Sequence, residues 1–165
     1  MDGALTDIRS PILRQALAYW NDKRGARAMP ARADIDPMEI IQILPHVILL
    51  DVLREPLDFR YRLIGTVNEE HMSEPYTGRR FSELPHQCAP SRIWSCSERV
   101  VRDKHPLRSD IPYVGPKRDF TSVEDIMMPL AADGATVDMI FVVIEYVQKR
   151  AEVAASLDTP ATIFG

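Results

Sequence analysis

Apolar and polar positions alternate most clearly over residues 57–64, LDFRYRLI. In an extended chain, one face of this segment would hold apolar side chains and the other charged ones: Leu57, Phe59, Tyr61 and Leu63 against Asp58, Arg60 and Arg62. A period of two is typical of a half-buried β-strand. A short apolar run at 47–53, VILLDVL, precedes it across the turn residues 54–56. The two segments together predict a β-hairpin.

A pattern with the helical period lies near the N-terminus. Ser10 precedes Pro11, Lys23 and Arg24 lie where the last turn would be, and Gly25 follows. A cap residue, an initial proline and a final glycine predict a helix that begins at Pro11 and ends before Gly25. Its apolar residues cover about half the circumference, so one side of the helix must be buried.

The rest of the chain predicts shorter helices and three more strands. Asp36-Pro37 is expected to start a helix that ends near Pro45. The later elements are weak helical pieces over 66–86, a clearer helix over 90–103, and strands over 107–114, about 120–131 and 136–147. Asp133-Gly134 is a strong hairpin signal between the last two strands. The last strand is apolar on both faces between residues 139 and 144, which implies cover on both sides.

This order of elements predicts an α+β fold. Five strands form an antiparallel sheet, because hairpins join its neighbours, and the short helices are inserted after the second strand. We expect an N-terminal helix and connector at 1–35, the main domain at 36–147, and a tail at 148–165.

Composition narrows the class of protein. The chain has 165 residues, 45% of them apolar, with 24 acidic and 20 basic residues and a net charge of −4. This balance argues against a nucleic-acid partner, and no apolar run is long enough to predict a membrane span. The N-terminus lacks the pattern of a secretion signal. Two cysteines, Cys88 and Cys96, are too few for a disulfide scaffold or a thiolate zinc site. We therefore expect a cytoplasmic domain.

An ordered set of short motifs resembles the PAS domain family, and more narrowly a group of small single-domain PAS-like proteins typical of alphaproteobacteria. The matching segments are Tyr19-Trp20, residues 30–32, Asp36-Pro37, Leu44-Pro45, Asp51, FRYRLIGT at 59–66, Thr77-Gly78 and Met128-Pro129-Leu130. The resemblance covers about residues 12–147. It implies a sensory or ligand-binding module with a small molecule between the sheet and the inserted helices. It also implies that the other sheet face and the N-terminal helix mediate dimerisation or signalling.

Two sets of residues follow as candidates. The ligand-pocket candidates are Phe59, Tyr61, Leu63, His71, Trp94, Tyr113, Ile126, Met128 and Met139. The candidates for a homodimer contact are Leu17, Trp20, Ile140, Val142 and Ile144. The first set is mostly apolar, with a few polar groups to orient a ligand. It suits a small apolar or amphipathic molecule, and equally a solid core.

No cofactor is predicted. Neither cysteine lies in the motif of a flavin photoreceptor or of a covalently attached chromophore. A haem would need an axial ligand, and the candidates are His46, His71, His86 and His105, each isolated among polar or turn residues. No metal site is expected.

Three functions remain open from the sequence. The first is a sensory module that binds a ligand and signals through an unidentified partner or a dimer change. The second is an interaction module of the same fold with a solid core. The third is a small-molecule enzyme that uses His71 and Glu70. Because no nucleophile elbow, phosphate-binding loop or zinc-protease motif is present, we expect no enzymatic activity.

Overall fold

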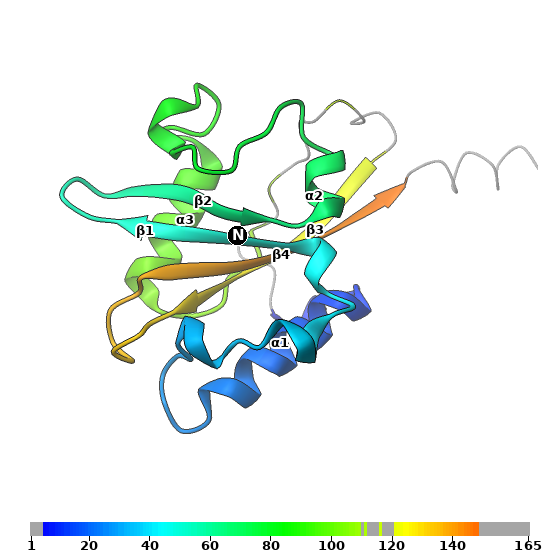
Figure 1. The fold of residues 1–165 in the computed structure, drawn as a ribbon, viewed down its shortest axis with the longest axis vertical. Helices are drawn as coiled ribbons and strands as arrows, with labels where there is room; N and C mark the ends of the chain where they lie inside the picture. Colours follow the sequence, from blue (N-terminus) through cyan, green and yellow to red (C-terminus); the bar gives the residue numbers. More distant parts are fainter. Residues whose placement is uncertain (1–4, 110, 112–115, 117–120, 149–165) are drawn as a thin grey trace, which may run out of the picture.

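The computed structural model describes residues 5–109, 111, 116 and 121–148. Its centre is a four-stranded antiparallel sheet in the order β2-β1-β4-β3. The strands are β1 (Val47–Leu53), β2 (Asp58–Ile64), β3 (Thr121–Leu130) and β4 (Met139–Gln148). The first and last hairpins are therefore joined through β1 and β4 at the middle of the sheet. Figure 1 shows helix α1 on one side of this sheet and the segment from α2 to α3 on the other.

The first hairpin contains an irregularity that changes which side chains share a face. Leu49 is paired with Leu63, and the next residue, Leu50, is paired with Tyr61. Arg62 is therefore an extra, unpaired residue, as in a β-bulge. The side chains of Tyr61 and Leu63, which a regular strand would place on one face, lie on opposite faces. The expected alternation holds as far as Tyr61, but Leu63 is turned to the opposite side and is 41% exposed.

Helix α1 (Pro11–Arg24) forms where the sequence predicts it. The side chain of Ser10 accepts a hydrogen bond from the backbone N–H of Leu13, and Gly25 ends the helix with a positive φ of 56°. The helix packs on β3 and β4. Its start is fixed to β3, because the carboxylate of Glu124 accepts hydrogen bonds from the backbone N–H groups of Arg9 and Ser10.

The segment between β2 and β3 covers the other side of the sheet. It contains α2 (Thr66–Glu70) and α3 (Arg92–Asp103), with a 3-10 turn at Phe81–Glu83 between them. Helix α3 begins at the predicted place, where the Ser91 side chain accepts a hydrogen bond from Trp94 N, and it packs on β3. Cover on both sides explains why β4 is apolar on both faces: Ile140, Phe141, Val142 and Val143 are all buried.

One expectation about the elements is corrected. The helix expected after Asp36 is only one 3-10 turn, Pro37–Ile40. Asp36 caps it as predicted, but Glu39 forms a salt bridge of 2.7 Å with Lys23 of α1 instead of closing a capping box. Further 3-10 turns lie at Leu5–Asp7, Arg32–Asp34 and Leu44–His46, so Pro45 lies inside a turn.

The fifth strand, expected over 107–114, stays a prediction. Of the segment 107–114, the described part contains one isolated bridge, between Leu107 and Met127. Residues 110 and 112–115 lie outside the described residues, as does the expected helical stub after Gln148. The described sheet therefore has four strands. Within the described ranges, no helix is both long enough and apolar enough to cross a lipid bilayer.

Candidate functional site

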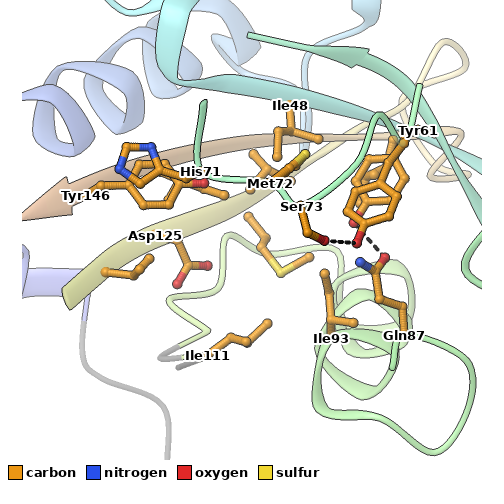
Figure 2. Close-up of a pocket in the computed structure, with 16 residues that line it drawn as sticks. Ile48, Tyr61, His71, Met72, Ser73, Gln87, Ile93, Ile111, Asp125 and Tyr146 are labelled. Carbon is orange, nitrogen blue, oxygen red and sulfur yellow. Dashed lines mark hydrogen bonds between the residues drawn. The ribbon is translucent and has the colours of Figure 1, made fainter. Parts of the chain in front are cut away.

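A cavity of about 190 Å³ lies between the sheet and the segment from α2 to α3. Strands β1, β3 and β4 form its floor, and the residues after α2 and the start of α3 form its walls (Figure 2). Its lining is largely apolar, with a few polar side chains, and consists of Ile48, Leu50, Tyr61, His71, Met72, Ser73, Tyr76, Gln87, Ile93, Ile111, Val123, Asp125, Met127, Val142, Ile144 and Tyr146. An apolar cavity with a small number of polar groups is typical of small-molecule sites.

One end of the cavity is built around Tyr61. Its ring is stacked on Tyr76, with centroids 5.7 Å apart, and its hydroxyl donates a hydrogen bond of 2.6 Å to Oε1 of Gln87. Burial raises the pKa of the Tyr61 phenol well above its usual value, and the hydrogen bond to Gln87 opposes this only in part. Tyr61 therefore remains a neutral hydrogen-bond donor throughout the physiological pH range.

The opposite end contains Asp125, His71 and Tyr146. The carboxylate of Asp125 is buried on the cavity side of β3 and accepts a hydrogen bond from the hydroxyl of Ser109. His71 follows α2 directly, and its Nδ1 donates to the carbonyl oxygen of Val67 at 2.8 Å. Its ring is stacked almost parallel on Tyr146 of β4, with centroids 3.9 Å apart (Figure 2). This stack connects the end of α2 to the edge of the cavity floor.

Of the predicted pocket residues, Tyr61 and His71 line the cavity. Phe59 and Trp94 lie beside it in an aromatic cluster instead. Phe59 is fully buried, with the Trp94 ring edge-on at 5.3 Å and the Phe81 ring at 5.4 Å. These rings fill the space between β2 and α3 and form a solid wall next to the cavity. Tyr113 lies outside the described residues.

The other predicted pocket residues do not line the cavity, because of strand parity. Ile126 and Met128 alternate with the cavity-lining Val123, Asp125 and Met127, so they are buried on the side of the sheet that α1 covers. Met139 is absent from the lining and is partly buried against the core. Leu63 is turned away by the irregularity at Arg62. Neighbouring residues of a strand point to opposite faces, so an error of one position exchanges the two sets.

The predicted dimer residues are also placed differently. Val142 and Ile144 line the cavity. Trp20 and Ile140 are buried inside the protomer, at 3% and 0% exposure. Leu17 is partly buried against the core and keeps part of its side chain accessible. Both faces of the sheet are thus occupied within the chain. Helix α1 covers one face, and the cavity lies on the other.

The most informative residue that sequence reasoning missed is Gln87. It belongs to no predicted element and comes within reach of Tyr61 only because the chain turns between β2 and α3. Met127 and Asp125 were missed for another reason, since each lies one position away from Ile126, which the sequence favours. The alternation within β3 was a usable signal for them, but it does not tell which of the two faces meets the inserted segment.

The described residues contain no cluster of potential metal ligands. Across residues 5–109, 111, 116 and 121–148, no three His, Cys, Asp or Glu side chains gather as metal ligands would. Among the predicted haem ligands, His71 lines the cavity, and His46 uses its Nδ1 to donate to the carbonyl oxygen of Ile144 at 2.9 Å. An engineered protein cavity of about 150 Å³ holds a benzene molecule, so a site of about 190 Å³ has room for a one-ring molecule.

A four-stranded antiparallel sheet with an apolar cavity under an inserted helical segment defines a small α+β domain. A family model described as a PAS domain matches residues 8–144 of the chain, so the chain belongs to the PAS domain family. The match includes α1 and the sheet up to residue 144 in β4. No relative of this chain was found among curated proteins. PAS domains are in general sensory or interaction modules and not enzymes.

Proposed function

We propose that this chain is a sensory PAS module that binds a small, largely apolar molecule in the cavity and passes its occupancy to a partner. The cavity of about 190 Å³ is the observation that carries the proposal. Protein interiors are close-packed and contain few voids larger than a water molecule. An apolar space of this size, bordered by polar side chains from several parts of the chain, is more than packing needs.

The strands of the cavity floor provide a route for the signal. Met127 and Val142 face the cavity, while their neighbours Ile126 and Val143 are fully buried on the opposite face, towards α1. Helix α1 is also tied to β3 by hydrogen bonds: Glu124 binds its start, and the indole N–H of Trp20 donates to the carbonyl oxygen of Pro129 at 2.8 Å. A ligand that shifts β3 therefore shifts the attachment of α1, provided that it binds the two states with different affinity.

The readout is proposed to be a partner chain or a second copy of this one. Of the predicted dimer residues, only Leu17 is on α1 and still partly accessible. The narrower placement among small alphaproteobacterial PAS proteins, and a cytoplasmic location, remain predictions from the motifs and from the low cysteine content of the sequence. Enzymatic turnover is not proposed.

The test is a pair of mass measurements on freshly purified protein, under native and denaturing conditions. We expect an added mass in the native state that is lost on denaturation. Val142→Phe, which fills part of the cavity, is expected to abolish the added mass. Val147→Phe makes the same change on the same strand at an exposed position and should retain it.

The alternative is an interaction module without a ligand. An absence of added mass in the native protein, together with unchanged backbone hydrogen exchange in α1 when Val142 is replaced by Phe, would contradict the sensory proposal. It would favour the interaction module. Retention of the added mass by Val142→Phe would show that the bound molecule lies elsewhere.

A further inference from the structure

The hydrogen bond between Tyr61 and Gln87 determines which end of the Gln87 amide faces the cavity. The Tyr61 side chain is buried, so a hydroxyl hydrogen without an acceptor would be costly. The hydroxyl lies 2.6 Å from Oε1 of Gln87 and donates to it. The amide oxygen is therefore used by Tyr61, and the amide nitrogen points away from it. Figure 2 shows this nitrogen turned towards the interior of the cavity.

The amide nitrogen of Gln87 carries two N–H groups that no described residue accepts. The amide is nevertheless positioned by its hydrogen bond to Tyr61, and the backbone of Gln87 is held on both sides. Its N–H donates to the carbonyl oxygen of Leu84 at 2.9 Å, and its carbonyl oxygen accepts from the Ser91 hydroxyl at 2.7 Å. Ser91 is also the cap of α3, so the start of that helix holds the backbone of Gln87 in place. The cavity thus presents a pre-oriented hydrogen-bond donor at its Tyr61 end.

Charge and size restrict the ligand further. The described lining includes the Asp125 carboxylate but no lysine or arginine. An anionic ligand would therefore be buried near this carboxylate, and the described lining would offer the ligand no cationic side chain, which is unfavourable. The volume of about 190 Å³ accommodates a single ring with a short substituent.

We propose that the cavity selects a neutral, one-ring molecule whose carbonyl oxygen accepts a hydrogen bond from Nε2 of Gln87, with its apolar body between β3, β4 and α3. This inference rests on the proposed function, because it specifies the class of molecule that occupies the same cavity. Met127, Val142 and Ile93 supply the apolar contacts. Tyr61 acts as a positioning residue, because it holds the amide of Gln87 in the orientation that exposes the donor.

The test uses four probes of nearly equal shape and measures their affinities for the full chain by titration calorimetry. Acetophenone has the neutral carbonyl acceptor, ethylbenzene lacks it, benzoate is an anion and benzylamine is a cation. A single net hydrogen bond of about 1 kcal/mol corresponds to a preference of about five-fold. We expect acetophenone to bind at least about five-fold more tightly than ethylbenzene, and benzoate to bind more weakly than both.

Two variants distinguish the effect of the Gln87 hydrogen bond on ligand preference from the effect of changed packing. The double variant Tyr61→Phe with Gln87→Met removes both partners together, and such paired replacements are close to neutral for stability. It is expected to bind acetophenone and ethylbenzene equally. Gln42→Met makes the same change at an exposed glutamine and is expected to keep the preference. Circular dichroism confirms that each variant is folded.

The outcomes are distinct. Equal or tighter binding of ethylbenzene, benzoate or benzylamine by the original chain would overturn the neutral-acceptor inference but leave a ligand-binding cavity. A preference for acetophenone that survives in the folded double variant would overturn the role of Gln87. Binding of none of the four probes would overturn the inference, and the mass measurements on purified protein would then decide separately whether the cavity binds any molecule.

Discussion

The indole N–H of Trp20 in α1 donates a hydrogen bond of 2.8 Å to the carbonyl oxygen of Pro129 in β3, 109 residues later in the chain. Trp20 is buried, so this bond joins the N-terminal helix to the strand that also carries Asp125 and Met127 of the cavity. The relationship makes α1 an integral layer of the protomer. It also connects β3, which lines the cavity, directly to α1, the helix proposed to transmit the signal.

Trp20→Phe is predicted to lower the free energy of unfolding without changing the oligomeric state. The variant loses one buried hydrogen bond and part of a buried ring, a cost of about 1–3 kcal/mol. Urea denaturation followed by circular dichroism measures it. Trp94→Phe is the matched control, because the Trp94 ring is only partly buried and we expect a smaller loss there. A variant of unchanged stability that dissociates in sedimentation experiments would instead restore Trp20 as a dimer contact.

Gly65→Ala is predicted to be strongly destabilising. A Cβ atom at this position would lie 2.5 Å from the carbonyl oxygen of Leu44 and would also clash with that of Pro45. Both obstacles are backbone atoms that cannot turn aside, so we expect a loss of about 3 kcal/mol. Gly25→Ala has free space but a φ of 56° and is expected to cost about 1–2 kcal/mol. Thermal unfolding of the two variants compares them, and an equal or smaller loss at Gly65 would contradict the close approach.

Tyr61 is predicted to make the protein less stable at alkaline pH. Its pKa is raised by burial, so the folded state retains the phenol proton above about pH 10, where an unfolded tyrosine loses it. The unfolded state then binds fewer protons than the folded state, and stability falls as pH rises, by up to about 1.4 kcal/mol per pH unit. At pH values below the pKa of tyrosine in the unfolded chain, the stability that neutral Tyr61 contributes is fully present.

The measurement is the free energy of unfolding in urea between about pH 8 and pH 11. Tyr61→Phe is expected to have a shallower alkaline decline than the original chain. Tyr76→Phe removes a hydroxyl beside the same cavity and is expected to keep the steeper decline that Tyr61 causes. Identical slopes in the original chain and in Tyr61→Phe would mean that the phenol is not buried as a neutral group.

The sequence by itself determined the local elements of this protein. Helix α1 and the start of α3 were predictable because caps and helix-ending residues act over a few positions, as Ser10, Gly25 and Ser91 do. Strand β2 was predictable because its apolar residues alternate, and β1 and β4 because they are short apolar runs next to turn residues. The motif set was enough to indicate the family. The apolar character of both faces of β4 also predicted correctly that the sheet is covered on both sides.

Only the tertiary structure decided which side chains meet in the cavity. The extra residue at Arg62 turns Leu63 away, and the pairing of β3 with β4 puts Met127 and Val142 in the cavity while Ile126 and Met128 are buried on the opposite face. Strand parity depends on hydrogen bonds between distant segments, and a shift of one residue exchanges the faces. Gln87 reaches Tyr61 for the same kind of reason, because the path of the chain between β2 and α3 brings the two together.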